Sequence, residues 1–99
     1  MTQQYIRGEL SLRLEELCRL EELRDGHLAA AELCALRELR RWVELAPTVE
    51  LPRVAADAMD MVDAACWASL ASGDLAAFDR ECREGASLYE FVTCAGLLR

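Results

Sequence analysis

The chain has 99 residues, of which 54% are hydrophobic, and a formal net charge of −7. This length favours a single domain spanning residues 1–99. All 11 basic residues are arginines, and 18 acidic residues outnumber them. Affinity for phosphate comes from Lys and Arg, so this excess of acid argues against direct binding to nucleic acid or to an anionic membrane.

Leu and Ala supply most of the apolar content, and both are strong helix formers. Val, Ile and Thr, the residues that favour strands, are few. We therefore expect an all-α domain, a compact bundle of four to five short amphipathic helices.

The first two predicted helices run from Gly8 to Arg24 and from His27 to about Leu45. Each has an apolar stripe with helical spacing: Leu10, Leu14 and Leu17 in the first, and Leu33, Leu36, Leu39 and Val43 in the second. The connection between them is short, so we expect an antiparallel N-terminal helical hairpin.

The third predicted helix runs from Arg53 to about Ala71 and follows an extended, Pro-flanked connector over residues 47–52. Its sequence is apolar around most of the circumference, which is typical of a central helix. Asp57, Asp60 and Asp63 form the narrow polar exception.

The C-terminal third predicts two shorter helices. Asp74 is a suitable N-cap for a helix from Leu75 to about Glu84, and Gly85 would end it. Ser87, with Glu90 three residues later, has the pattern of a capping box for a fifth helix.

The negative charge is concentrated in the middle of the chain. Seven acids and one arginine lie between Glu44 and Asp79, so this segment carries −6. The preceding part has eight acids and seven arginines, and the following part has three of each. An acidic segment of this kind sets which surfaces the protein can approach.

No pattern indicates catalysis or a metal site. His27 is the only histidine and lies at an expected helix start, which suits a turn or capping residue better than a general base. The sequence lacks close Cys/His pairs and Gly-rich phosphate loops. We expect no enzyme activity, no cofactor and no bound metal.

The five cysteines, at positions 18, 34, 66, 82 and 94, are widely spaced and odd in number. This argues against a disulfide framework, and we expect each to pack as a small hydrophobic residue. The N-terminus lacks the pattern of a signal peptide and no apolar run could span a bilayer, so a cytoplasmic location is expected.

Two further groups have alternative interpretations. Arg37, Arg40 and Arg41 form the one basic cluster, either as a solvated helix face or as a contact for an acidic partner. Trp67 shares a side of its helix with Asp60 and Asp63. It belongs either to an interface or to the packing beneath the connector or the C-terminal helix.

These features predict a non-catalytic inhibitor whose acidic face occludes a basic, nucleic-acid-binding surface of another protein, as anti-CRISPR proteins and DNA mimics do. The alternative is a homodimeric helical assembly or scaffold unit. A small-molecule pocket among Met59, Met61, Trp42 and Phe91 is a third hypothesis. The predicted partner-binding residues are Glu50, Asp57, Asp60, Asp63, Trp67 and Asp74.

Overall fold

The computed structural model describes residues 2–23 and 26–97, and within them the chain is all-α, as predicted. This part of the chain contains four α-helices: α1 (Gln3–Leu23), α2 (Ala30–Leu45), α3 (Leu51–Ala71) and α4 (Leu75–Cys94). A short 3₁₀ helix, η1 (Thr48–Glu50), precedes α3.

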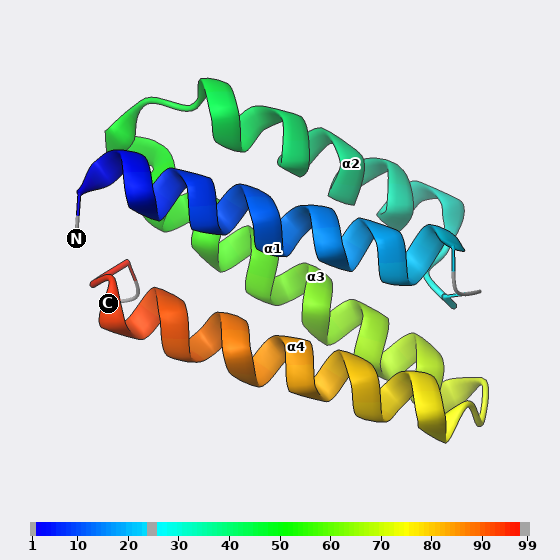
Figure 1. The fold of residues 1–99 in the computed structure, drawn as a ribbon. Coiled ribbons are helices and arrows are strands. Elements are labelled where there is room, and N and C mark those ends of the chain that lie inside the picture. The colour runs from blue at the N-terminus through cyan, green and yellow to red at the C-terminus, as the bar shows by residue number, and fades with distance from the viewer. Residues whose placement is uncertain (1, 24–25, 98–99) are drawn as a thin grey trace.

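The helices lie along a common long axis, and the chain reverses direction at each connection (Figure 1). The bundle measures 39 × 23 × 20 Å. α3 packs most extensively against α4, and α1 packs against α2. α1 and α3 each contact all three other helices, so these two helices form the centre of the bundle.

The core consists of aliphatic side chains from all four helices. Leu10 and Leu14 of α1, Leu36 and Val43 of α2, and Val92 of α4 are at most 1% exposed. Full burial of such a side chain contributes about 1.5–3 kcal/mol, so these stripes determine which face of each helix turns inward.

α3 buries a stripe of mostly small side chains at spacings of one, three and four residues: Leu51, Val54, Ala55, Ala58, Val62, Ala65 and Ser69. Small residues let neighbouring helices approach closely. The opposite side of α3 is open to solvent and carries Asp60, Asp63 and Trp67. The central helix therefore has a broader exposed face than its composition predicts.

The helix boundaries at the N-terminal half differ from the prediction. α1 begins at Gln3 rather than Gly8, because the Thr2 hydroxyl accepts a hydrogen bond from the Tyr5 N–H at 3.1 Å and starts the helix earlier. The predicted end at Arg24 lies outside the described residues. α2 begins at Ala30 rather than His27, with the Glu32 carboxylate accepting from the Ala29 N–H at 3.2 Å.

The connector before α3 is not extended throughout. Thr48–Glu50 forms a 3₁₀ turn, and α3 begins at Leu51, two residues earlier than predicted. Arg7 of α1 fixes this corner, because its guanidinium donates hydrogen bonds of 2.7 Å to the carbonyls of Val43 and Ala46. These carbonyls at the end of α2 would otherwise lack helical partners.

The predicted break at Gly85 is wrong, because α4 continues through it to Cys94. A Cβ at residue 85 would lie 2.8 Å from Cγ1 of Val62, so glycine here permits the close approach of α3 and α4. The predicted capping box is also absent, since Ser87 accepts a hydrogen bond from Arg13 at 2.5 Å inside a continuous helix. The predicted cap at Asp74 is confirmed, with its carboxylate accepting from the Ala77 N–H at 3.1 Å.

Candidate functional site

A groove of about 520 Å³ lies between α2 and α3. We call it the α2–α3 groove; it is lined by Ala35, Glu38, Leu39, Trp42, Asp57, Asp60 and Met61. Its size is within the range of about 300–1,000 Å³ that is typical of ligand sites. The groove combines an apolar floor with carboxylates contributed by both helices.

The apolar part of the groove is centred on Trp42. This indole is 45% exposed, while its neighbours Leu39 and Met61 are buried and half-buried. A large aromatic side chain that is half open to solvent beside aliphatic groups offers a flat surface for stacking. Trp42 was not among the predicted partner-binding residues, and from sequence it was assigned only to a hypothetical small-molecule pocket.

Of the three carboxylates that line the groove, only Glu38 forms an ion pair among the described residues. Glu38 is paired with Arg41 at 3.0 Å on α2. Among the described residues, Asp57 and Asp60 form no ion pair, and the lining includes no basic residue. The α3 side of the groove is therefore available to an incoming cation.

The other predicted residues on α3 continue this surface beyond the groove. Asp63 is exposed and Trp67 is 70% exposed. The alternative in which Trp67 packs beneath the connector or the C-terminal helix is therefore wrong. We call Asp57, Asp60, Asp63 and Trp67 the acidic face of α3.

The two remaining predicted residues lie at opposite ends of α3. Glu50 immediately precedes its first residue, and Asp74 lies three residues after its last. The 24 intervening steps correspond to about 35 Å at ~1.5 Å per helical residue. Glu50 and Asp74 therefore do not border one common site with the groove.

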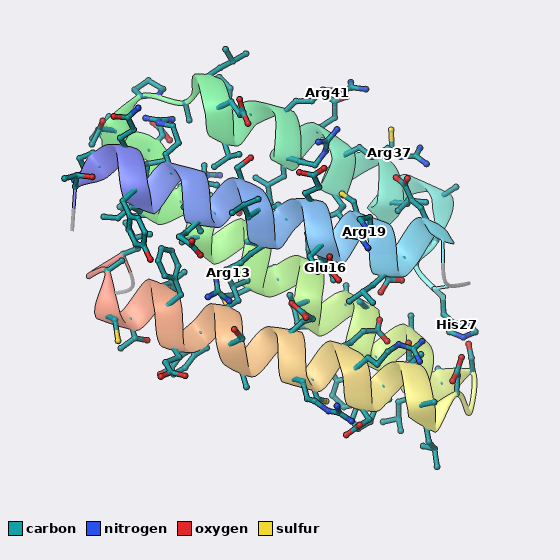
Figure 2. All side chains as sticks on the ribbon, in the orientation of Figure 1. Arg13, Glu16, Arg19, His27, Arg37 and Arg41 are labelled. Carbon is teal, nitrogen blue, oxygen red and sulfur yellow. The ribbon has the colours of Figure 1, made fainter. Side chains whose placement is uncertain are left out.

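Asp74 has a structural role of its own. Besides capping α4, it lies 2.9 Å from Nε2 of His27, which comes from the α1–α2 connection. Figure 2 shows His27 at the end of the bundle where α4 begins. The hydrogen bond with His27 lowers the pKa of Asp74, with a further contribution from the Ala77 N–H. His27 therefore links the α1–α2 connection to the α3–α4 connection.

The arginine cluster lies in a second groove, between α1 and α2. This groove has a volume of about 330 Å³ and is lined by Glu15, Cys18, Arg19, Glu22, Arg37, Arg40 and Arg41. Arg37 pairs with Glu22 at 2.5 Å, and Figure 2 shows Arg37 and Arg41 on α2 with Arg19 on the neighbouring α1. Most of its positive charge is thus neutralised by glutamates on the same two helices.

The predicted small-molecule pocket is not formed as a unit. Trp42 and Met61 line the α2–α3 groove, but Phe91 and Met59 do not. Phe91 is buried elsewhere, with the Arg13 guanidinium 5.1 Å from its ring centroid and Tyr5 at 6.5 Å in an edge-on arrangement.

Two carboxyl groups are buried in the bundle and were not anticipated. Glu21 of α1 is 6% exposed and Glu81 of α4 is 2% exposed. The Ser69 hydroxyl donates to Oε1 of Glu81, whereas neither Oε2 atom of the two glutamates receives a hydrogen bond from another residue. Gly26 closes over the Glu21 carboxyl, at a position where a Cβ would clash with Oε2.

A protonated Glu21 carboxyl can donate a hydrogen bond to the Glu81 carboxylate. Burial raises the pKa of Glu21 to about 8, and its hydrogen bond and charge repulsion with Glu81 act in the same direction. Glu21 is therefore protonated at neutral pH. In sequence, the two glutamates are 60 residues apart and resemble any surface acid, so no local signal identifies them.

The cysteines are more exposed than predicted. Cys18 is buried, but Cys34, Cys82 and Cys94 are exposed, and Cys66 is intermediate. The expectation of five packed thiols is wrong for the three exposed residues, because their helices bury other faces.

Within residues 2–23 and 26–97, no three His, Cys, Asp or Glu side chains are grouped to hold a metal ion. In the same ranges, no helix has the length and apolar character needed to cross a membrane. Comparison with protein-family models, with curated proteins and with solved structures finds no match to this chain.

Proposed function

We propose that this protein is a non-catalytic, cytoplasmic regulator that binds another protein through the α2–α3 groove and the acidic face of α3. The observation that carries the proposal is the combination of a half-exposed Trp42 with Asp57 and Asp60, which have no ion-pair partners among the described residues. Tryptophan is enriched among the residues that contribute most to binding at protein interfaces, and polar groups form the rim around such residues.

The chemistry of the groove favours an arginine on the partner. A guanidinium stacks on an indole face and donates paired hydrogen bonds to carboxylates, whereas the ammonium of lysine forms no planar pair. Arginine in the groove would stack on Trp42 while bonding to Asp57 or Asp60. Asp63 and Trp67 then extend the contact along α3.

A partner surface rich in arginine is the kind that binds nucleic acid. Covering it with the acidic face would exclude phosphate and inhibit the partner, which is the mode of action of anti-CRISPR proteins and DNA mimics. This analogy is one of physical class, since the supporting features are charge and exposure.

The test of the contact uses a short Arg–Ala repeat peptide as the probe, with Lys–Ala and Glu–Ala repeats for comparison. Binding is followed by tryptophan fluorescence in the parent protein and in Trp42→Phe and Trp67→Phe variants. We expect the order Arg, Lys, Glu, with the signal change lost in Trp42→Phe. The same affinity for the Arg and Glu repeats would overturn the proposal.

A matched pair of variants tests where the charge acts. Asp60→Asn/Asp63→Asn and Glu15→Gln/Glu90→Gln each remove two negative charges from exposed helix positions. Loss of charge-assisted contacts should weaken Arg-peptide binding about tenfold and flatten its salt dependence in the first variant only. Equal weakening in both variants would indicate a net-charge effect and contradict a specific face.

The test of inhibition uses proteins retained from a host extract on the parent protein and on both variants. A retained protein that elutes with salt and is lost with Asp60→Asn/Asp63→Asn is then assayed for DNA or RNA binding with and without the regulator. Inhibition that disappears in this variant supports occlusion, and simultaneous binding of the nucleic acid and the regulator contradicts it.

Exposed aliphatic residues on the N-terminal helices favour the homodimeric assembly as a second candidate. Leu12 of α1 is 61% exposed and Leu45 of α2 is 77% exposed. A stable dimer would cover about 1,000 Å² or more of such surface. Analytical ultracentrifugation decides between the candidates, since a dimer that dissociates in Leu12→Glu supports assembly and a monomer across micromolar concentrations excludes it.

A further inference from the structure

Two cysteine thiols face each other across the contact between α3 and α4. The Sγ atoms of Cys66 and Cys82 are 4.0 Å apart, although the residues are 16 positions apart in sequence. Within residues 2–23 and 26–97, no other pair of thiols is in hydrogen-bonding contact. Five cysteines can form ten pairs, and this arrangement favours a disulfide in only one of them.

The surrounding contacts hold the two helices at this spacing. Gly85, one turn after Cys82, packs against Val62, one turn before Cys66. Ser69 and Glu81 add a hydrogen bond between the same helices. A disulfide needs an S–S distance of about 2.05 Å, so the sulfurs must approach by about 2 Å. Cys82 is exposed, so rotation of its side chain would be the least costly way to close this distance.

We propose that Cys66 and Cys82 are a site of oxidative modification, at which a hydroperoxide converts the two thiols into a disulfide that links α3 to α4. The exposed Cys82 reacts first. Its thiolate attacks the peroxide, the O–O bond breaks, and the products are the Cys82 sulfenic acid and one molecule of water or alcohol.

Cys66 completes the reaction. Its sulfur attacks the Cys82 sulfur, the S–O bond breaks and the S–S bond forms, and the hydroxyl leaves as water with the Cys66 proton. The two thiols together lose two electrons and two protons, and the peroxide is reduced by the same two electrons.

The environment of the pair assigns these roles. Burial raises the pKa of Cys66 to about 12, and the hydrogen bond with Cys82 and the nearby charges of Cys82, Glu81 and Asp63 act in the same direction. Cys66 is thus a protonated thiol at neutral pH and reacts slowly with peroxide by itself, because the thiolate is the nucleophile. It can still resolve the sulfenic acid, because the 4.0 Å separation of the two sulfurs makes this attack intramolecular.

The disulfide would lie next to the acidic face of α3, since Trp67 directly follows Cys66 and Asp63 precedes it by three residues. It would fix α3 against α4 at the C-terminal end of that face. The proposal does not depend on the identity of any partner, because it rests on the two thiols alone.

The experiment uses the folded, fully reduced full-length chain and a small excess of hydrogen peroxide, followed by trapping of free thiols with N-ethylmaleimide. Cleavage after arginine places each cysteine in a different fragment: residues 14–19, 25–37, 54–80, 81–83 and 84–99. We expect fragments 54–80 and 81–83 to be joined and to separate again after treatment with dithiothreitol. The cysteines in the other three fragments should remain alkylated.

Matched variants distinguish this pair from general thiol oxidation. Cys66→Ser and Cys82→Ser should abolish the linked fragments, whereas Cys34→Ser and Cys94→Ser, both at exposed positions, should retain them. Oxidation in concentrated urea should lose the preference, because the native spacing is then absent. The oxidised protein should also melt at a temperature about 15 °C higher, as expected for a bridge closing a loop of this length.

Three results would overturn the proposal. The first is a disulfide that involves Cys34 or Cys94 at least as often as the Cys66–Cys82 bridge. The second is oxidation of Cys82 to the sulfinic acid while Cys66 stays alkylated. The third is equal selectivity in buffer and in urea.

Discussion

Replacement of Glu21 by Gln tests the buried carboxyl pair by removing the Glu21 proton from the acid–base equilibrium. The amide has nearly the same size as the carboxyl group, and its NH₂ can donate to Glu81 in place of the acidic proton. The variant therefore keeps the shape and one hydrogen bond of the site while no longer ionising.

The direction of the effect follows from the raised pKa. The folded protein holds the Glu21 proton up to about pH 8, whereas the unfolded chain loses it near 4.5, the ordinary value. Between these values the folded state binds more protons, so the free energy of unfolding falls as the pH rises. The stabilisation is fully present below pH 4.5 and is lost by about pH 8.

The size of the effect is a substantial part of the protein's stability. The difference between 4.5 and about 8 corresponds to at most about 5 kcal/mol, at ~1.36 kcal/mol for each pH unit. A domain of this size has a total stability of about 5–15 kcal/mol. We expect Glu21→Gln to be more stable than the parent protein at pH 8 by at least about 2 kcal/mol, with this advantage disappearing toward pH 5.

The assay is urea unfolding followed by circular dichroism at intervals from pH 5 to pH 9, with extrapolation to zero denaturant. Glu90→Gln is the control, because Glu90 is exposed on the same helix as Glu81. A parent protein whose stability is constant from pH 5 to pH 8 would refute the reasoning. So would a Glu90→Gln variant that gains as much at pH 8 as Glu21→Gln.

Three further substitutions test the packing and the connections. Gly85→Ala should destabilise the protein by up to about 2 kcal/mol, because the clash with Val62 outweighs the higher helix propensity of Ala. In a Val62→Ala background the clash is absent, so the same change should stabilise the protein by about 1 kcal/mol. A double-mutant cycle of urea unfolding measures this reversal, and equal effects in both backgrounds would contradict the contact. Asp74→Ala should lower the melting temperature at neutral pH, because it removes the cap of α4 and the contact to His27. The difference in melting temperature between the variant and the parent should shrink well below pH 3.8, where Asp74 of the parent is protonated, since its pKa is lowered. Leu36→Ala should cost about 2–5 kcal/mol in urea unfolding, and a cost below 1 kcal/mol would show that this fully buried position is not packed.

The α-helical class and the apolar stripes could be predicted because they depend on local spacing. Leu10, Leu14 and Leu17 recur at helical intervals, and all three are buried. The cap at Asp74 could be predicted for the same reason, since a capping side chain reaches a backbone N–H only three residues away.

Gly85 shows where local reasoning fails. A glycine near an expected helix end indicates termination when only the chain is considered. In the bundle, the same residue admits the Val62 side chain of another helix, and α4 continues. Glycine thus favours termination at an exposed helix end, whereas at a close helix–helix contact it allows the helix to continue.

The candidate site was predicted in part. The acidity of Asp57, Asp60 and Asp63 is a property of the sequence, and their helical spacing placed them on one side of α3. Trp42 joins them only because α2 packs beside α3, which no spacing within either helix reveals.

Sequence patterns are sufficient to show that this chain forms helices, which side chains could be buried, and that its middle segment is acidic. These properties follow from interactions between residues a few positions apart and from formal charge. Three contacts depend on the tertiary structure: that of Glu21 with Glu81, that of Cys66 with Cys82, and the position of the exposed Trp42 beside Asp57 and Asp60 in the α2–α3 groove. Each of these depends on how two helices are placed against each other, which is set by the packing of the whole core.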